Sequence, residues 1–357
     1  IEYTEIEEGA RKIVTNEGFY DLKNKKAQFG KRPVIYDGSV TITAQTITTD
    51  DSTGISKLTG NAVYKDTTEG IAVLANYIES NKHTGSFFAT IDPLLILKQN
   101  EDSIYITGDT LLSGKLSKLF PDIYTDSLSQ NPADSAAQEK VYLKDSADRF
   151  FMAWHNVLIF SDSLQGKSDS LFYAAVDSTF KLFTEPVLWM SGSQITGDTI
   201  YLYTKNKEAD RLYVAENGII INQTGENTFN QIRGNRLNGY FIEGALDYMR
   251  AQGNSESIYY VRDDNEKIIG VNKATSDIID IRFKNKEINK VVFISEVNGT
   301  TYPPSQFPED QRKLRDFIWR EDERPKNKEA LFEKPVINLS EDKADNVPVE
   351  NNSQDNQ

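Results

Sequence analysis

The sequence holds few residues whose types and spacing are those of a catalytic or metal site. Its two histidines, His83 and His155, lie far apart in the chain, and no carboxylate stands at metal-ligand spacing beside either of them. There is no cysteine, which excludes disulfides, thiolate zinc sites and cysteine nucleophiles. We expect both histidines to be structural or surface residues, and we expect neither a metal nor a cofactor.

Two segments resemble ligand-binding loops but lack a residue that the loop needs. The stretch from Gly108 to Lys115 resembles a phosphate loop, yet five residues rather than four separate Gly108 from Gly114, and Leu116 replaces the Ser or Thr. Asp50 to Gly54 resembles the start of a calcium loop, yet Gly60 stands where the bidentate glutamate is required. Both stretches are better explained as turns between strands.

Carboxylates are the remaining candidates for chemistry. Two of them facing one cleft can act as acid and base in a glycosidase, and Asp263 with Asp264 or Asp102 with Asp109 are conceivable pairs. Nothing in the sequence places either pair in one cleft, and chance pairs are expected among 54 acidic residues. The sequence favours a protein that is not an enzyme.

Aspartate followed by Ser or Thr recurs along the chain, and this repetition indicates structure. An Asp side chain accepts hydrogen bonds from backbone amides two residues on and fixes a turn, after which Ser or Thr begins the next strand. An active site is needed once, whereas a corner is needed at every level of a repeat. The predicted structural turn residues are Asp102, Asp109, Asp169, Asp177 and Asp198.

The pentapeptide Ile106–Thr110 recurs letter for letter as Ile195–Thr199. Upstream of each copy a proline opens an apolar run, Pro93–Leu97 and Pro186–Met190. Apolar residues also alternate with polar ones in many short segments, among them Val40–Ala44 and Ile200–Tyr203, which is the period of half-buried strands. Repeated strand-turn-strand units predict an all-β protein of antiparallel hairpins, stacked as a sandwich, a barrel or an elongated roll.

The chain divides into two β blocks and three other segments. We predict a first block over residues 1–114, a long loop over 115–147, a second block over 148–302, a helix region over 303–332 and a disordered tail over 333–357. The helix is expected because Pro308, Glu309 and Asp310 precede an apolar stripe at Leu314, Phe317 and Ile318.

Charge and hydropathy restrict the partners. The 357 residues carry a formal net charge of −14, which repels a phosphate backbone and makes nucleic acid an unsuitable partner. No apolar run approaches the roughly 18 residues that span a bilayer, and the first residues lack the features of a signal peptide. We expect the chain as given to be soluble, and we treat any export signal as not part of this sequence.

A set of turn and strand motifs recurs in a fixed order over about residues 30 to 320: Leu58–Val63, Ala75–Glu79, Asp102–Leu111, His155–Val157, Asp169–Tyr173, Pro186–Trp189, Gln194–Thr199, Gly253 with Asn254, Ser257–Tyr260 and Gly270–Asn272. Together these motifs resemble the OstA-like family, and in particular its long, Bacteroidetes-type members. That family includes the periplasmic lipopolysaccharide-transport proteins LptA and LptC and the amino-terminal domain of LptD.

This resemblance implies an elongated β-jellyroll of stacked, V-shaped antiparallel strands, formed here by tandem OstA-like units. It also implies a periplasmic protein that binds lipopolysaccharide and shields its acyl chains in an apolar groove between the inner and outer membranes. The expected groove-lining residues are Val40, Ile42, Ile71, Val73, Leu95, Leu97, Ile104, Ile106, Leu158, Phe160, Leu171, Leu188, Ile200, Leu202, Leu212 and Val214.

The end strands of such a roll have unpaired backbone groups that invite pairing with another β-jellyroll protein of the Lpt type or head-to-tail self-association. We expect one such edge between Arg11 and Leu22. Two alternatives stay open at this point. The interior can be closed and dry, as in a β-scaffold or adhesin, or one sheet can bind carbohydrate through exposed aromatics, for which Tyr201 and Tyr203 are the candidates.

Overall fold

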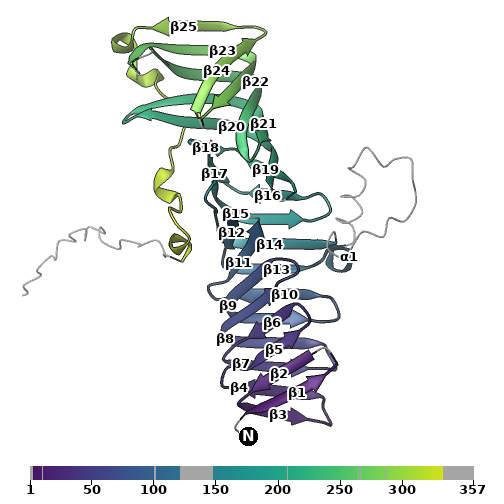
Figure 1. Cartoon of the computed structure of the whole chain (residues 1–357). Coiled ribbons are helices and arrows are strands. Elements are labelled where there is room, and N and C mark those ends of the chain that lie inside the picture. The colour runs from purple at the N-terminus through teal and green to yellow at the C-terminus, as the bar shows by residue number, and fades with distance from the viewer. Residues whose placement is uncertain are drawn as a thin grey trace, which may run out of the picture.

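The computed structural model describes residues 3–332, except residue 10, residues 100–101, residues 121–147 and residues 207, 264, 266 and 286. The described chain forms one elongated stack of antiparallel strands that rises from β1 and β3 at one end to β25 at the other (Figure 1). The 25 strands of the described residues all belong to one hydrogen-bonded sheet. The predicted all-β architecture is confirmed.

The lower part of the stack consists mainly of short strands and one helical turn. In chain order its elements are β1 (Thr4–Glu8), β2 (Arg11–Thr15), β3 (Glu17–Asp21), β4 (Lys26–Gly30), β5 (Val34–Asp37), β6 (Val40–Thr43), β7 (Thr46–Asp50), β8 (Ile55–Asp66), β9 (Ile71–Asn81), β10 (Ser86–Thr90), β11 (Leu94–Gln99), β12 (Asp102–Thr107), β13 (Thr110–Lys115) and the helical turn α1 (Leu116–Leu119).

The upper part contains several longer strands. Its elements are β14 (Arg149–Phe160), β15 (Leu164–Ala174), β16 (Thr179–Phe183), β17 (Val187–Met190), β18 (Ser193–Thr196), β19 (Thr199–Lys205), β20 (Glu208–Gly225), β21 (Thr228–Ile242), β22 (Ala245–Arg262), β23 (Ile268–Lys284), β24 (Glu287–Ile294) and β25 (Asn298–Tyr302).

Long strands bend so that one strand contributes to two opposing faces. β8 shows the pattern: its Val63–Asp66 end pairs with β6, and its Ile55–Thr59 end pairs with β7. Between these ends Gly60 and Asn61 adopt positive φ angles of 78° and 44°, and the register with β9 skips them. The bend turns alternate side chains of both halves toward a shared interior.

The same corner recurs at higher levels. His155 with Asn156 in β14, and Glu216 with Asn217 in β20, have φ angles between 50° and 56° and are likewise skipped by the pairing. At each corner a carbonyl accepts the amide of the neighbouring strand, as when Asp109 N donates to His155 O at 2.9 Å. These bonds stack the corners in a column along the roll.

Both copies of the repeated pentapeptide lie in this column. Ile106 and Ile195 are fully buried on β12 and β18, and a corner follows each strand. Gly108 and Gly197 allow the close approach of the next corner, because a Cβ on Gly197 would lie 2.2 Å from Cγ1 of Val214 and 3.0 Å from the Glu216 carbonyl oxygen.

The aspartates of the repeat use asparagines of the next strand as partners. Asn156 Nδ2 lies 3.2 Å from both carboxylate oxygens of Asp109, and Asn217 Nδ2 lies 3.2 and 3.4 Å from those of Asp198. The expected bond from an amide two residues on is found instead at Asp177, which accepts from Thr179 N at 3.1 Å.

The other two predicted turn residues also lie where the chain changes direction. Asp169 is at the corner within β15, where its amide donates to Thr184 O and its carboxylate lies 3.0 Å from Nδ1 of His155. Asp102 begins β12 opposite Gln99. His155 is exposed, and its hydrogen bond with Asp169 raises its pKa.

One hydrophobic core runs through both predicted blocks. Its buried members extend from Ile13 to Ile288, and β14 pairs with both β12 and β13, so the strands on either side of residues 121–147 share one sheet and one interior. Of the predicted loop over 115–147, Lys115 ends β13 and residues 116–119 form the helical turn α1, whereas residues 121–147 and the predicted tail over 333–357 lie outside the described residues.

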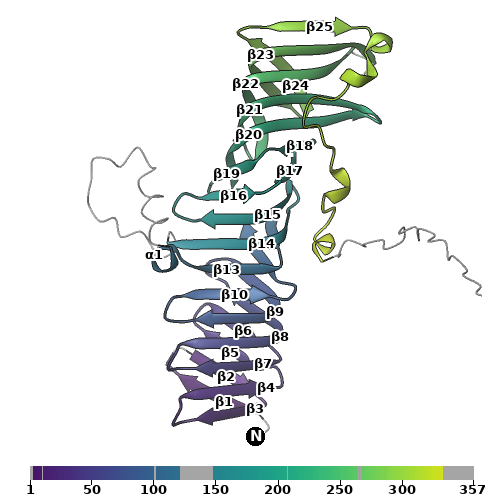
Figure 2. The same ribbon diagram turned by 180° about the vertical axis from the view of Figure 1, so that it is seen from behind.

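The predicted carboxy-terminal helix is wrong. Residues 303–332, which we call the strap, are extended and contain only short 3₁₀ turns at η1 (Pro304–Gln306), η2 (Glu309–Gln311), η3 (Glu321–Glu323) and η4 (Glu329–Leu331). The strap descends along the outside of the upper stack (Figure 2).

Side-chain amides of the sheet replace the helical hydrogen bonds of the strap. Gln231 donates to Arg312 O at 2.7 Å and accepts from Leu314 N at 2.8 Å. Gln194 bonds Ile318 O and Arg320 N in the same way, at 2.7 Å each. The apolar stripe read as a helix face packs on the sheet, where Leu314 and Phe317 join a second hydrophobic cluster that contains Ile219, Ile221, Ile258 and Phe229.

The corner column predicts a large effect of a small substitution. Gly197→Ala places a methyl group against Val214, which is fully buried, so the neighbouring strand must shift. We expect a loss of about 1–3 kcal/mol in the free energy of unfolding, measured by urea denaturation. Gly30→Ala is the matched control, because its Cβ would approach only the Glu17 side chain, at 3.4 Å. Equal midpoints for both variants would contradict this account of the corner.

The strap should loosen in acid. Glu323 accepts from Arg320 Nε at 2.5 Å and from Lys167 Nζ at 2.5 Å, and these bonds, chiefly that from Arg320, lower its pKa from 4.5 to about 2. Because the folded pKa is depressed, the stabilisation is complete above about pH 4.5 and is lost as pH falls toward 2.

We therefore expect Glu323→Gln to unfold at lower urea concentration than the parent protein at pH 6 and at nearly the same concentration near pH 2. Glu309→Gln serves as the control, since that side chain is 87% exposed. A gap between the Glu323→Gln and parent midpoints that stays constant from pH 6 to pH 2 would refute the assignment.

Candidate functional site

A groove of about 350 Å³ opens between the hairpin ends of the lower stack, on the side away from the corner column. Its floor is apolar and comes from successive levels of both opposing faces, because alternate residues of each strand turn inward. The floor residues are Ile35, Val40, Ile42, Ile71, Phe87, Leu95, Leu97, Phe150, Phe151, Tyr173 and Phe180.

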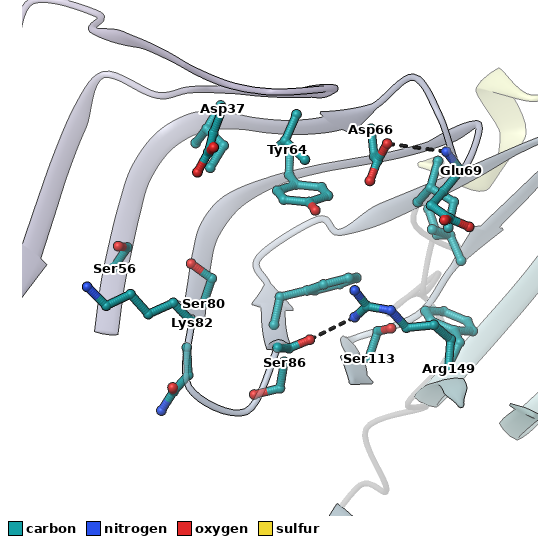
Figure 3. A pocket seen from close by; sticks show the side chains of 18 of the residues that line it. Asp37, Ser56, Tyr64, Asp66, Glu69, Ser80, Lys82, Ser86, Ser113 and Arg149 are labelled. Carbon is teal, nitrogen blue, oxygen red and sulfur yellow. Dashed lines mark hydrogen bonds between the residues drawn. The ribbon is translucent and has the colours of Figure 1, made fainter. Parts of the chain in front are cut away.

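Hairpin turns form the two lips of this groove (Figure 3). One lip carries Asp37 from the β5–β6 turn and Asp66 and Glu69 from the β8–β9 turn. The opposite lip carries Lys82 from the β9–β10 turn and Arg149 from the start of β14. Serines 56, 80, 86 and 113 lie on this second lip as well.

The carboxylates of the first lip differ in how they are held. Asp66 Oδ1 accepts from Ser39 Oγ at 2.9 Å, from Thr68 N at 2.9 Å and from Glu69 N at 3.2 Å, which fixes the turn. Within the described part of the chain, the carboxylates of Asp37 and Glu69 make no hydrogen bond or ion pair. This lip therefore presents unneutralised negative charge to the mouth of the groove.

The cations of the second lip are also held differently. Lys82 Nζ lies 3.3 Å from a carboxylate oxygen of Asp51, so much of its charge is neutralised. Arg149 Nη1 donates to Gly85 O at 2.8 Å, and no carboxylate of the described residues pairs with its guanidinium. Arg149 thus keeps its positive charge and most of its donors at the mouth.

Tyr64 stands between the lips. Its ring stacks on Phe87 with the centroids 6.0 Å apart, and its hydroxyl has no hydrogen-bond partner among the residues described. Burial raises the pKa of Tyr64, the carboxylates of Asp66, Asp37 and Glu69 raise it further, and Arg149 opposes them. The hydroxyl stays protonated at neutral pH and can both donate and accept.

The predicted lining residues fall into three groups. Five of them line the groove: Val40, Ile42, Ile71, Leu95 and Leu97. Nine belong to the packed core or lie against it: Val73, Ile104, Ile106, Leu171, Leu188, Ile200, Leu202, Leu212 and Val214.

Leu158 and Phe160 belong to neither group. Val157 and Ile159 are the buried residues of this run, and Phe160 lies beside Tyr105 with ring centroids 6.4 Å apart. All four residues from Val157 to Phe160 are apolar, so no alternation marks the inward side.

The groove does not extend through the whole roll. Its lining ends at Phe180, and at higher levels the interior is packed, with Ile200, Val214, Ile232 and Leu237 fully buried. Sequence reasoning missed Tyr64, Phe87, Lys82 and Arg149. Only Arg149 had a signal, since it opens the aromatic run with Phe150 and Phe151 that begins β14.

A second hollow of about 920 Å³ lies beside the corner column under the strap. It is polar, and Asp169, Asp198, Asp316, Lys167 and Arg320 are among its lining residues. Within the described ranges, no cluster of three or more His, Asp or Glu side chains has the arrangement of a metal site. The helices of the described residues include none that is long and apolar enough to cross a membrane.

The aromatic candidates for carbohydrate binding pack against their neighbours. The Arg211 guanidinium lies 4.0 Å from the ring centroid of Tyr203 and covers one face of that ring. Tyr201 lies beside Tyr213 with ring centroids 5.7 Å apart. Stacking of a sugar on these rings has no support in this arrangement.

Comparison with known proteins gives little beyond the fold. No family model and no curated protein matches the sequence. Among solved structures the chain is similar to that of LptH, the LptA homologous periplasmic component of the conserved lipopolysaccharide transport device from Pseudomonas aeruginosa. The two share 10% identity over 52% of this chain and 85% of that chain, with a TM-score of 0.20. A likeness this weak says nothing about the ligand of this chain.

Proposed function

We propose that this protein is a periplasmic, non-enzymatic lipid carrier that shields the acyl chains of lipopolysaccharide in its groove during passage between the inner and outer membranes. One observation carries the proposal: an apolar floor that continues over several levels of the lower stack and opens to solvent between two charged lips. The sequence segments that resemble the OstA-like family support the same substrate.

The energetics of such binding need no covalent step. Each methylene moved from water to the groove floor contributes about 0.8 kcal/mol, while sugars and phosphates remain in solvent beyond the lips. Because successive levels have a similar apolar floor, a chain can slide from one level to the next with little change in free energy.

The lower end of the roll supports assembly with a similar protein. β2 is paired on both sides, with β1 and β5, so the edge predicted between Arg11 and Leu22 lies at β3, which pairs only with β4 in the part of the chain described. Phe19 is 69% and Leu22 84% exposed at this end. An open edge with exposed apolar side chains favours the addition of a strand from another β-jellyroll.

The lipid proposal is tested by photo-crosslinking. A photoreactive amino acid at Ile42, on the groove floor, should give an adduct with lipopolysaccharide. The same group at Tyr36, which is 45% exposed and does not line the groove, should give none. The readout is the shifted band detected with antibody to lipopolysaccharide. Adducts of equal yield at both positions, or none at Ile42, would sink the proposal.

The assembly proposal is tested at the lower edge. Phe19→Asp should weaken concentration-dependent self-association about tenfold or more, because it places a charge on the apolar edge. Ile242→Asp is the control, since Ile242 is 61% exposed but lies at the end of β21. Sedimentation velocity over a concentration series measures both. Association of the Phe19→Asp protein that matches the parent protein would argue against this edge.

A further inference from the structure

The mouth of the groove has opposite charges on its two sides, and this asymmetry restricts the head group that fits there. Figure 3 shows Asp37, Asp66 and Glu69 on one side of the mouth and Lys82 and Arg149 on the other, with the Tyr64 side chain pointing from the first side into the space between them. The groove lining as a whole includes five carboxylates, Asp37, Asp50, Asp51, Asp66 and Glu69, but only three cations, Arg11, Lys82 and Arg149.

Part of this charge is already neutralised within the protein. Asp51 pairs with Lys82 at 3.3 Å, and Asp50 lies 3.4 Å from Lys26. Arg11 is the cross-strand neighbour of Asp37 in the register of β2 and β5, so these two opposite charges offset each other without an ion pair. The charges left to meet a ligand are those of Asp66 and Glu69 on one lip and Arg149 on the other.

These remaining charges suit one chemical class. A phosphate beside Arg149 would accept from a guanidinium whose one hydrogen bond within the described residues is to Gly85 O. The Tyr64 hydroxyl, which has no partner among those residues, can also donate to it. A second anionic group toward the other lip would meet Asp66 and Glu69 and be repelled. An ammonium group there would be attracted.

We propose that the groove selects an amphiphile with a zwitterionic head, in which a single anionic group faces Arg149 and an ammonium group faces Asp66 and Glu69. This inference rests on the proposed acyl-chain binding and adds the class of head group. It applies to a lipopolysaccharide whose lipid phosphate carries an amine as well as to smaller lipids of the same charge pattern.

The test uses three single-chain lipids of equal chain length, each below its micelle concentration. These are a lysophosphatidylethanolamine, a lysophosphatidic acid and a monoacylglycerol, which have zwitterionic, anionic and neutral heads. Each displaces a fluorescent fatty-acid probe from the full chain. We expect the zwitterionic lipid to bind about three- to tenfold more tightly than either the neutral or the anionic one.

Two variants assign the preference to the lips. Glu69→Gln should lower the affinity for the zwitterionic lipid and raise the affinity for the anionic one, each about threefold. It should leave the affinity for the neutral lipid unchanged. Arg149→Gln should lower the affinity for both lipids that carry a phosphate. Glu226→Gln is the matched control, because Glu226 is exposed and does not line the groove. Unchanged melting temperatures confirm that each variant is folded.

The outcomes separate this inference from the proposed function. Equal affinity for all three lipids, or tightest binding of the anionic one, overturns the head-group inference and leaves acyl-chain binding intact. A preference that Glu69→Gln does not change also overturns it. If none of the three lipids displaces the probe, both proposals fail together.

Discussion

The fold depends on a backbone constraint at the corner of each level. A strand can contribute to both opposing faces only if it turns sharply, and pairs such as Gly60 with Asn61 or Glu216 with Asn217 achieve this by adopting left-handed φ angles. The left-handed conformation is unfavourable for most residue types other than glycine and asparagine. It is held by the neighbouring strand, whose amide donates to the corner carbonyl, as Asp198 N does to Glu216 O. Each corner therefore depends on the next one in the column.

The corner column leaves the other side of the roll free to open. On that side Leu246 N donates to Ser191 Oγ at 3.4 Å between turns of the opposing faces at an upper level, and side-chain volume decides whether the space between the faces is filled. At the levels of Ile42 and Leu97 the space stays open as a groove, whereas at the levels of Val214 and Ile232 it is packed. The same backbone architecture thus supports a groove below and a solid core above.

The strap explains why the upper stack differs from the lower. In β20 the consecutive residues Ile219, Ile220 and Ile221 are all buried, because the interior covers one side of the strand and the strap covers the other. Strands buried on both sides are continuously apolar rather than alternating. The amides of Gln194 and Gln231 satisfy the backbone of the strap, which lets it lie extended on the sheet without a strand partner.

The sequence by itself determined what depends on local chemistry. Alternation at Val40–Ala44 and turn residues between short apolar segments were enough to predict an all-β stack, and the repeated pentapeptide marked its corners. Only the tertiary structure decided what depends on distant partners. The apolar stripe at Leu314 and Phe317 is compatible with either a helix or an extended segment. The extended form is selected by Gln231, which lies 81 residues before Arg312 and donates to its backbone carbonyl. Likewise, no local sequence motif marks the residues at the mouth of the groove, such as Tyr64, Glu69 and Arg149. The mouth forms only where turns from separate levels of the stack come together.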